Sequence, residues 1–465
     1  MLKAAGVAAG AAGLATTPAA PSLAAGGAFA HPGLLHTRTD LARMAAKVKA
    51  GASPYTAGYA KLTANRHAQS GWTANPQAVV YRGAGSPQNY ATLYNDVHAA
   101  YQNALRYHVG GDSAHADTAV AVLNAWSAKL TQVAGSADRF LAAGLYGYQL
   151  ANAAELVRDH ADFDLARCQE MLSKVFAPLS DDFLRHHNNA VVTNYWTNWD
   201  LCAMACVLAT GIFCDDKAQV ARAVEYFKHG DGLGAIGHAI PVVYDDGLGE
   251  WLEAGRDQGH ALLGVGLMGT FCEMAWNQGI DLYGYDDSRF LKGAEYVAKW
   301  SLGGQVPYTA NTRRKGAIGG WSGTETASAA AAVDPAMTRP IWAMIANHYI
   351  RRRGLPATYL TRIAARSAPE GGGGDYGPNS GGYDQLGFGT LAFTRDRTPA
   401  LSPSPALSPS PSPAPAGGDL AATGSGDMVG WAAAAGVTTL AGGLLLLRRR
   451  NRVRGGGIDE APSPQ

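Results

Sequence analysis

The sequence predicts a mainly α-helical fold, a ring of helical hairpins in one domain, with a short β-like segment at its C-terminal end. Apolar residues recur at spacings of three and four over a series of segments of roughly 11 to 20 residues, which is the period of an amphipathic helix. Short breaks rich in Gly, Asp or Asn separate these segments, as in GGDS at 110–113 and GSAD at 135–138. Helices joined by such short connections pack as antiparallel hairpins.

A series of helices follows from this spacing along the chain. They are predicted at 93–105, 119–126, 140–157, 165–184, 199–213, 261–276, 290–300 and 340–351. Strand-like alternation is scarce before the end of the body, where LGFGTLAF at 386–393 predicts a short strand or a capping segment. Neither a Rossmann nor a P-loop glycine pattern occurs, so no nucleotide-binding motif is indicated.

Both ends of the chain are typical of targeting segments, which are set aside before the fold is considered. Residues 1–30 contain one Lys, a small apolar run and AxA-like sites, so we expect a secretory signal peptide and export. The helical body then covers 31–397. Residues 398–419 are rich in Pro and Ser, cannot bury a core, and predict an extended, semi-rigid stalk.

The C-terminal segment 420–465 combines a peptide motif, an apolar stretch and a basic end. LAATG runs from Leu420 through Thr423 to Gly424, the apolar stretch 428–447 is long enough to span a bilayer, and RRRNRVR follows it. This order resembles the LAxTG form of the sorting signal of Gram-positive surface proteins. The resemblance implies that a sortase cuts between Thr423 and Gly424 and joins the protein to peptidoglycan in the cell wall. A plain C-terminal membrane anchor is the alternative, and both place the body on the extracellular face.

Charge and cysteine content narrow the possible partners. The 38 Lys and Arg residues nearly balance the 37 Asp and Glu residues, so no global field draws in nucleic acid, and a polyanion must be recognised locally. The five cysteines form no CxxC pair and lie in predicted helices, which does not indicate a disulfide framework. No HExxH, CxxC or DxDxDG spacing is present, so no metal or cofactor is expected.

One short stretch, GEWLEAGRDQGHALLG at 249–264, concentrates polar groups just ahead of an apolar run. Residues three and four apart share a face of a helix. If the stretch enters a helix, one surface therefore carries Glu253, Arg256, Asp257 and His260. That surface is either the wall of a cleft or a solvated face.

Four segments together carry a resemblance across nearly the whole body. They are ALRYHVGGDSAHADTAVAVLNAWS at 104–127, TNWDLCAMACVLATGIFCDD at 197–216, EAGRDQGHALLGVG at 253–266 and YDQLGFGTLAF at 383–393. In this order they resemble the alginate-lyase-like family of polysaccharide lyases. The resemblance implies an incomplete (α/α) toroid with a groove across one end, and cleavage of an anionic, uronic-acid polysaccharide, alginate-like or glucuronan-like, by β-elimination.

Such a reaction sets clear demands on a site. The proton on carbon 5 of a uronate is barely acidic beside an ionised carboxylate, so the enzyme must offset that charge with donors placed where charge develops. A base must then take the proton, and an acid must protonate the leaving oxygen on carbon 4.

The resemblance assigns the neutralising role to two residues, Asn198 of an Asn-Trp motif and Arg256 of the GRDQxH motif. His260 follows Arg256 by one helical turn and is the expected base or acid. Tyr195 and Tyr244 are the nearest phenols to the two motifs. A phenol serves as base only when a neighbouring cation or hydrogen bonds depress its pKa, a role open to Arg256.

Four further side chains are expected to contact substrate: Trp199, Gln258, Glu253 and Asp257. Taken alone, Glu250 and Glu253 also fit first-turn acids of a helix, and Asp257 also fits an ion pair that orients Arg256. The better-known members of the family carry an Asn-Asn-His run at the start of the neutraliser's helix. Here that place reads YWTNWD, and the histidines 186–187 lie at the end of the preceding predicted helix, where they fit a cap.

Two other functions stay open. A glycoside hydrolase on a similar toroid would use Glu250, Glu253 or Asp257, but hydrolysis requires two carboxyls about 5 to 10 Å apart across the bond, which residues crowded on one turn supply poorly. The other is a glycan-binding wall protein without catalysis.

Overall fold

The computed structural model describes residues 27–83, 87–374, 376 and 382–396. The chain separates into two units, 1–402 and 403–465, and all described residues belong to the first. The predicted stalk, the sorting signal with Leu420, Thr423 and Gly424, the apolar stretch 428–447 and most of the predicted signal peptide lie outside the described residues. Within the described residues, no helix is long and apolar enough to cross a membrane.

Helices dominate the described part of the chain. They are α1 (Arg38–Lys49), α2 (Tyr55–Thr63), α3 (Tyr90–Gly110), α4 (Ser113–Lys129), α5 (Asp138–Leu156), α6 (Leu165–Met171), α7 (Ala177–His186), α8 (Thr197–Phe213), α9 (Lys217–His229), α10 (Ile236–Ala239), α11 (Gln258–Asn277), α12 (Tyr285–Ser301), α13 (Trp342–Ala346), α14 (Thr358–Ser367) and α15 (Gly389–Ala392). Two short π-helical stretches, Leu172–Phe176 and Asn347–Arg352, continue α6 and α13.

Two small two-stranded sheets complete the fold. Strands β1 (Val79–Arg82) and β2 (Gln132–Gly135) pair in parallel. Strands β3 (Asn311–Gly316) and β4 (Ser322–Ala327) form an antiparallel hairpin, with Arg313 opposite Glu325 and Lys315 opposite Gly323.

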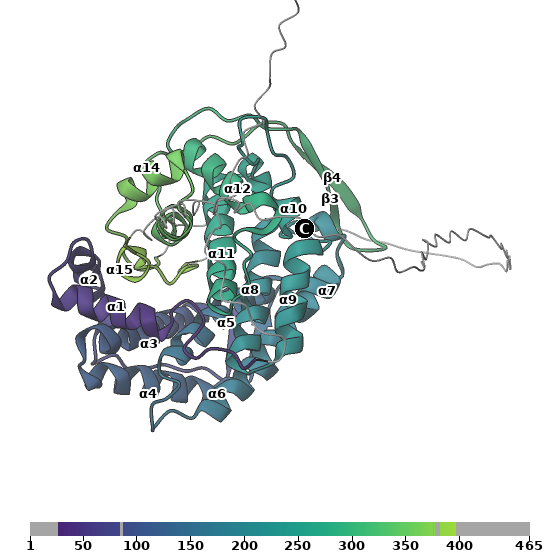
Figure 1. The fold of residues 1–465 in the computed structure, drawn as a ribbon. Coiled ribbons are helices and arrows are strands. Elements are labelled where there is room, and N and C mark those ends of the chain that lie inside the picture. Colours follow the sequence, from purple (N-terminus) through teal and green to yellow (C-terminus); the bar gives the residue numbers. More distant parts are fainter. Residues whose placement is uncertain (1–26, 84–86, 375, 377–381, 397–465) are drawn as a thin grey trace, which may run out of the picture. The chain divides into compact units, whose positions relative to one another are not determined.

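The helices form a closed ring of neighbours, drawn in Figure 1. Contacts run from α1 to α3, α5, α8, α11, α13, α15 and back to α1. A second set packs on this inner ring: α4 on α3, α7 on α5, α9 on α8, α12 on α11 and α14 on α13. This inner and outer pairing is the arrangement of an (α/α) toroid, so the predicted fold class is confirmed.

The inner helices are apolar on nearly every side because they are enclosed by neighbours. Almost every residue of α5, α8 and α11 is buried. Glycines let α5 approach α8 closely: a Cβ at Gly144 would lie 2.6 Å from Cys202 Sγ, and one at Gly147 would lie 2.5 Å from Cys206 Sγ. All five cysteines are free, and these two serve helix packing.

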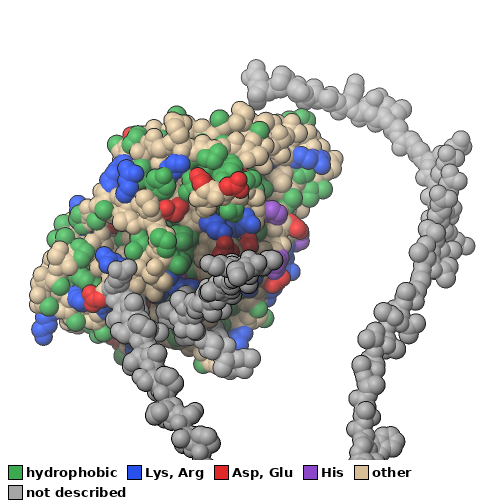
Figure 2. Space-filling view, turned by 45° about the horizontal axis from the view of Figure 1, so that its top comes forward, with side chains coloured by type: hydrophobic (Ala, Val, Ile, Leu, Met, Phe, Trp, Pro, Cys, Tyr) green, Lys and Arg blue, Asp and Glu red, His purple; other side chains and the backbone are tan. Residues whose placement is uncertain are grey.

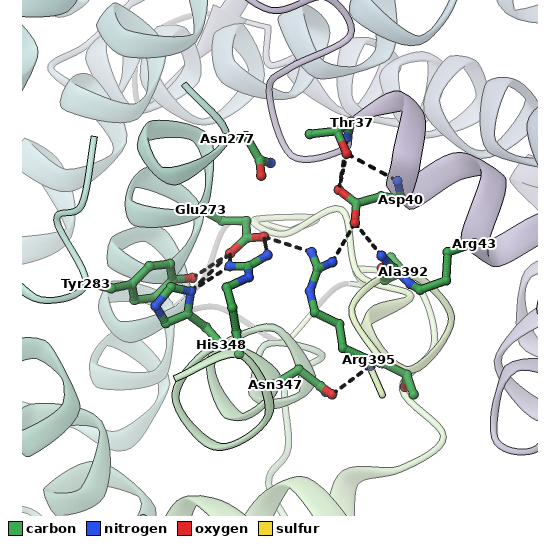
Figure 3. Close-up of polar contacts among 12 residues, drawn as sticks. Thr37, Asp40, Arg43, Glu273, Asn277, Tyr283, Asn347, His348, Ala392 and Arg395 are labelled. Carbon is green, nitrogen blue, oxygen red and sulfur yellow. Dashed lines mark hydrogen bonds and ion pairs between the residues drawn. The ribbon is translucent and has the colours of Figure 1, made fainter. Parts of the chain in front are cut away.

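A largely buried network of charges joins α1, α11 and the segment after α15 (Figure 3). Arg395, just after α15, donates to Asp40 of α1 at 2.7 Å and lies 3.4 Å from Glu273 of α11. Arg43 and Arg352 complete the pairs, at 2.5 Å from Asp40 and 2.9 Å from Glu273. Burial opposes ionisation of Asp40, but the two guanidiniums outweigh it and hold its pKa well below the usual range.

All of the predicted helices are present, but some other elements were not predicted. Within 386–393, where a short strand or a capping segment was predicted, Gly389–Ala392 form the helical turn α15, and Gly387 makes an isolated antiparallel bridge with Gly372. The first described residues pack against the body: Phe29 is buried, and Ala30 exchanges hydrogen bonds with Gln278 at 3.0 and 3.1 Å. The β3–β4 hairpin was not predicted because its polar sequence shows no apolar alternation.

Candidate active site

The two sequence motifs meet where α8 and α11 begin. Trp196, which precedes α8, packs with Leu252 of the 3-10 turn Leu252–Gly255 and with Leu233 in a small apolar cluster. The α11 helix starts at Gln258, and Asp257 caps it by accepting the His260 amide at 2.8 Å. The prediction that Glu253 to His260 share one helical face is therefore wrong, because a turn and a cap interrupt the segment.

Ion pairs nevertheless bring these side chains together. Arg256 Nη1 lies 2.8 Å from Glu253 Oε1, and Arg256 Nε lies 3.6 Å from Asp257 Oδ2. His260 Nδ1 lies 2.7 Å from the same Asp257 oxygen. Glu253 is fully buried, while the Arg256 side chain is 28% exposed and that of His260 is 12% exposed. The Arg256 and His260 side chains are thus partly in contact with solvent, whereas the supporting glutamate is not.

The carboxylate of Asp257 determines which nitrogen of His260 is free. An imidazole beside a carboxylate donates its proton there, which leaves a lone pair on the other nitrogen. Nδ1 faces Asp257, and Nε2 has no hydrogen-bond partner among the described residues. His260 is therefore oriented as a proton acceptor through Nε2.

The two acidic residues respond oppositely to their surroundings. Burial raises the pKa of Glu253, although Arg256 and His260 partly oppose this. Burial also acts to raise the pKa of Asp257, but hydrogen bonds from His260 outweigh it and lower the pKa. Asp257 is consequently the more firmly ionised of the two.

Trp196 lies against two guanidiniums. The Arg256 carbon lies 5.7 Å from its ring centroid, and that of Arg313 lies 4.4 Å away. Arg313, on β3, also donates to Glu325 and to the carbonyls of Thr193 and Asn194. Cations over an indole face are stabilised by the ring's quadrupole, so Trp196 helps to hold Arg256 in place. Arg313 was not predicted as a site residue, because the sequence NTRRKG contains no motif that indicates a function.

Tyr195 and Trp199 form an aromatic wall at the start of α8. Their ring centroids are 4.5 Å apart, and Phe183 lies 5.1 Å from Tyr195. Asn188 donates its amide to the Tyr195 hydroxyl at 2.9 Å, and Arg139 donates to Asn188 at 3.2 Å. The Tyr195 hydroxyl is thus connected to a cation through one amide.

The histidines before this wall differ from each other. His187 is the cap residue at the end of α7, as predicted, and is buried with Nε2 at 3.0 Å from Asp200 and 3.1 Å from Tyr226. His186 pairs with Asp182 in a largely exposed position. Neither histidine takes the place of the missing His beside Asn198.

Asn198 lies in the first turn of α8 and is 2% exposed. Its amide oxygen is buried and has no hydrogen-bond partner in the described part of the chain. An unpaired buried acceptor costs free energy, but an amide oxygen does not bind a carboxylate, so a role for Asn198 toward an anion would depend on its side-chain NH2 donor.

Tyr244 and Gln258 are engaged with the protein itself. The Tyr244 hydroxyl donates to Glu250 and lies 3.1 Å from Thr309, and burial together with the Glu250 carboxylate raises its pKa. Its surroundings therefore disfavour the phenolate that a base requires. The Gln258 side chain donates to the Asp334 carbonyl at 3.2 Å and accepts its amide at 2.8 Å, so both ends of the amide are occupied.

A deeper basic cluster adjoins this site and was not predicted. Arg339 pairs with Asp384 at 2.8 Å, and both are buried. A Cβ at Gly259 would lie 3.8 Å from Arg339 Nη2, so this cluster starts beside the first turn of α11. Arg82 lies over Tyr90 at 5.0 Å with Nη1 unpaired within the described residues. Single arginines in loops give no sequence signal, although Asp384 stands in the YDQ segment.

The charges at the surface are mixed. Figure 2 shows Lys and Arg side chains beside Asp and Glu side chains on one face of the body. Among the described residues, no group of three or more His, Cys, Asp or Glu side chains could hold a metal ion.

The ring of helix pairs defines a helical toroid, and Arg256 and the oriented His260 lie where two of its inner helices begin. The sequence model of the alginate lyase family matches residues 43–306, and the chain belongs to this family of polysaccharide lyases. A search of curated proteins gives no match.

Solved structures with a similar fold include three structures of two alginate lyases. One from Bacteroides ovatus is 13% identical, with a TM-score of 0.40 over 58% of this chain and 83% of that one. Alginate lyase A1-III from Sphingomonas species A1 is 14% identical, with a TM-score of 0.46 over 77% of this chain and 95% of that one. A variant of A1-III in complex with a tetrasaccharide is 14% identical, with a TM-score of 0.45 and the same coverage, 77% and 95%.

Proposed function

We propose that this polysaccharide lyase cleaves a uronic-acid polysaccharide, alginate-like or glucuronan-like, by β-elimination outside the cell. The observation that carries the proposal is the arrangement about Asp257. One carboxylate lies 3.6 Å from Arg256 Nε and 2.7 Å from His260 Nδ1. A guanidinium that can bind a carboxylate and an imidazole that can accept a proton are thereby held next to each other at the start of α11.

The chemistry follows from these groups. Arg256 binds the uronate carboxylate, which makes the proton on carbon 5 more acidic because charge develops toward the guanidinium. His260 Nε2 accepts that proton, the electron pair forms the double bond between carbons 4 and 5, and the bond from carbon 4 to the glycosidic oxygen breaks. The leaving oxygen takes a proton from an acid, for which Tyr195 is the available phenol beside the aromatic wall.

Asn198 adds a second, neutral donor. The residue lies in the first turn of α8, two positions after Trp196, whose ring centroid is 5.7 Å from the Arg256 guanidinium carbon. An amide hydrogen bond to the same uronate carboxylate would strengthen as charge moves onto it. Trp199 and Tyr195 then offer ring faces to the neighbouring sugar.

The engagement of the carboxylates argues against hydrolysis. Glu253 is fully buried under Arg256, and Glu250 accepts from Thr309 at 2.6 Å and from Tyr244. Asp257 is used by His260 and by the helix cap. Hydrolysis requires two available carboxyls on opposite sides of the scissile bond, and none of these three is available.

Display outside the cell is supported by the order of the terminal segments. A Pro/Ser stalk, the LAATG motif, an apolar stretch and an arginine cluster follow the body in the order of a wall-sorting signal. In this proposal a sortase joins Thr423 to peptidoglycan, and the stalk carries the lyase beyond the wall surface.

Absorbance in the ultraviolet tests the reaction directly. Purified full-length protein is mixed in turn with polymannuronate, polyguluronate, glucuronan and hyaluronan. A rise from the new double bond conjugated to the carboxylate supports the lyase, and Arg256→Ala, Asn198→Ala and His260→Ala are then ranked on that substrate. New reducing ends without the absorbance rise would identify a hydrolase instead, and binding without either signal would identify a glycan-binding protein.

A further inference from the structure

The described part of the chain exposes few large apolar side chains. They are Val243 at 38%, Ile318 at 67% and Trp321 at 73%. Ile318 and Trp321 both lie in the turn that joins β3 to β4, in the sequence GAIGGWS. Exposed large apolar side chains that lie close together often mark interaction sites, because binding of a partner removes their apolar surface from water.

The β3–β4 hairpin runs along the candidate active site. Thr309, two residues before β3, lies 3.1 Å from the Tyr244 hydroxyl at one end of the site. Arg313, in the middle of β3, lies over Trp196 at 4.4 Å. At the other end, the Val191 amide donates to Gly316 at 2.9 Å and the Ile318 amide donates to Asn189 at 2.9 Å. The hairpin is thus anchored from Tyr244 to the segment before the Tyr195 wall.

Strand geometry shows which face of the hairpin Trp321 occupies. Side chains at alternate positions and at paired positions share a face. Arg313, Lys315, Glu325 and the Gly323 position therefore share the face that meets Trp196. A Cβ at Gly323 would lie 2.9 Å from the Trp321 ring, so the indole lies over that face. Trp321 is directed to the same side as Arg313 while keeping most of its surface free.

The charge of the hairpin suits an anionic chain. Its strands carry Arg313, Arg314 and Lys315 against the single acid Glu325. Glu325 already pairs with Arg313 and lies 3.8 Å from Lys315. Lys315 is 38% exposed at its side chain, so its ammonium remains accessible beside the indole.

From this geometry we infer that Trp321 and Lys315 form a distal binding surface for the uncleaved part of the uronate polysaccharide. The inference rests on the proposed function, since it says where the rest of that same substrate chain binds. The indole stacks on the apolar face of a sugar ring, and the ammonium pairs with a uronate carboxylate. The surface continues the wall of Tyr195 and Trp199, so a long chain is held at both places at once.

Chain-length dependence tests the inference. We expect Trp321→Ala to raise KM on the long polymer roughly 3- to 10-fold, the size expected for loss of one ring contact. KM on the shortest oligosaccharide that is cleaved should stay at the wild-type value. Thr324→Ala is the matched control, because Thr324 is exposed on the opposite face of the same strand. A Trp321→Ala enzyme with wild-type KM on the polymer, or with an equal rise on both substrates, would overturn the inference.

A binding measurement separates this inference from the proposed reaction. Full-length protein is run through a native gel that contains the polyuronate, so retardation reports binding even if no cleavage occurs. Retardation that Trp321→Ala loses and Thr324→Ala keeps supports the surface, whereas a wild-type protein that is not retarded overturns it. Light scattering provides a third test. If Trp321→Ala converts a dimer to a monomer and leaves polyuronate retardation unchanged, the turn between β3 and β4 is a contact between copies of the protein, and the inference fails.

Discussion

The carboxylate of Asp257 holds His260 twice, through its side-chain nitrogen Nδ1 at 2.7 Å and through its backbone amide at 2.8 Å. The first bond orients the imidazole, and the second starts the helix on which the imidazole lies. The two oxygens of Asp257 are divided between these bonds, Oδ2 for the ring and Oδ1 for the amide.

Replacement of Asp257 by Asn should therefore separate activity from folding. An amide offers only one accepting oxygen, so it keeps the helix cap, at which Asn is as good as Asp, and no longer accepts the imidazole proton. The Asn NH2 can only donate to Nδ1, which places the imidazole proton on Nε2, so we expect Asp257→Asn to lower kcat by roughly 100-fold or more with a near wild-type Tm. Asp257→Ala should also lose about 1 kcal/mol of stability. An Asn variant as active as wild type would remove the orienting role.

The pair Arg256 and Glu253 should show that stability and activity can be restored independently. Arg256→Ala leaves a buried carboxylate without its cation, so we expect a loss of about 2 to 4 kcal/mol in the free energy of unfolding as well as of lyase activity. Adding Glu253→Gln removes the buried charge and should recover most of the stability but none of the activity. Urea unfolding and the absorbance assay measure the two effects. If the double variant regained activity, Arg256 would not bind the substrate carboxylate.

Two tyrosines near the motifs should behave differently when their hydroxyls are removed. Tyr195→Phe deletes the phenol connected through Asn188 to Arg139, and we expect kcat to fall about 100-fold or more. Tyr244→Phe deletes the donor to Glu250, and we expect a loss of about 1 to 2 kcal/mol in stability with kcat within roughly threefold of wild type. The reverse ranking of the two kcat values would make Tyr244 the proton-transfer residue.

A buried carboxyl that the proposed reaction does not use, that of Glu370, gives a prediction for the pH dependence of stability. Burial raises the pKa of Glu370 to about 8, although the Trp342 and Ala343 amides donate to it and oppose this. A carboxyl whose folded-state pKa is raised stabilises the fold below its unfolded value, near 4.5, and this contribution is lost as pH rises toward 8. Glu370→Gln should thus match wild type at acid pH and melt several degrees higher, roughly 2 to 6 °C, at pH 8.5. Equal Tm values at pH 8.5 would contradict the raised pKa.

Wall attachment depends on a single peptide bond in the proposed scheme. Thr423→Ala should abolish covalent linkage, so that muramidase digestion no longer releases the protein with wall fragments attached. The protein would then stay in the membrane fraction through the apolar stretch 428–447. Gly418→Ala, just ahead of the motif, is a control that should leave linkage intact. Wall linkage that persists in Thr423→Ala would favour another anchor.

Much of the fold was predictable because helical spacing is a local property of the sequence. The apolar periods at 140–157 and 199–213 predicted the ends of α5 and α8 to within two residues. The hairpin β3–β4 was not predictable, because its strands are held by pairing with residues 189–194 that lie far away in the chain. Pairing of that kind leaves no periodic trace in NTRRKG or SGTETA.

In the candidate site, too, residues within a sequence motif could be predicted, whereas residues brought there from distant parts of the chain could not. The GRDQGH motif indicated Arg256 and His260, yet the cap at Asp257 depends on where the helix begins, which the pattern misplaced. Arg313 reaches Trp196 only through the fold, and Arg339 reaches the start of α11 in the same way. Tyr244 was chosen by proximity in sequence, but its hydroxyl is committed to Glu250.

The network of charges around Asp40 also affects how the fold responds to a pulling force on the C-terminal end of the chain. Tension that travels along the chain from residue 397 onward enters the folded body at Arg395 and Asp396. Arg395 grips α1 and α11 together, and Asp396 grips Lys47 of α1 at 2.8 Å. A pull there is shared by α1 and α11 mainly through the partly buried Arg395, because the Asp396–Lys47 pair is largely exposed to solvent. An enzyme tethered by its C-terminus to a moving or growing surface would keep its shape under such a load.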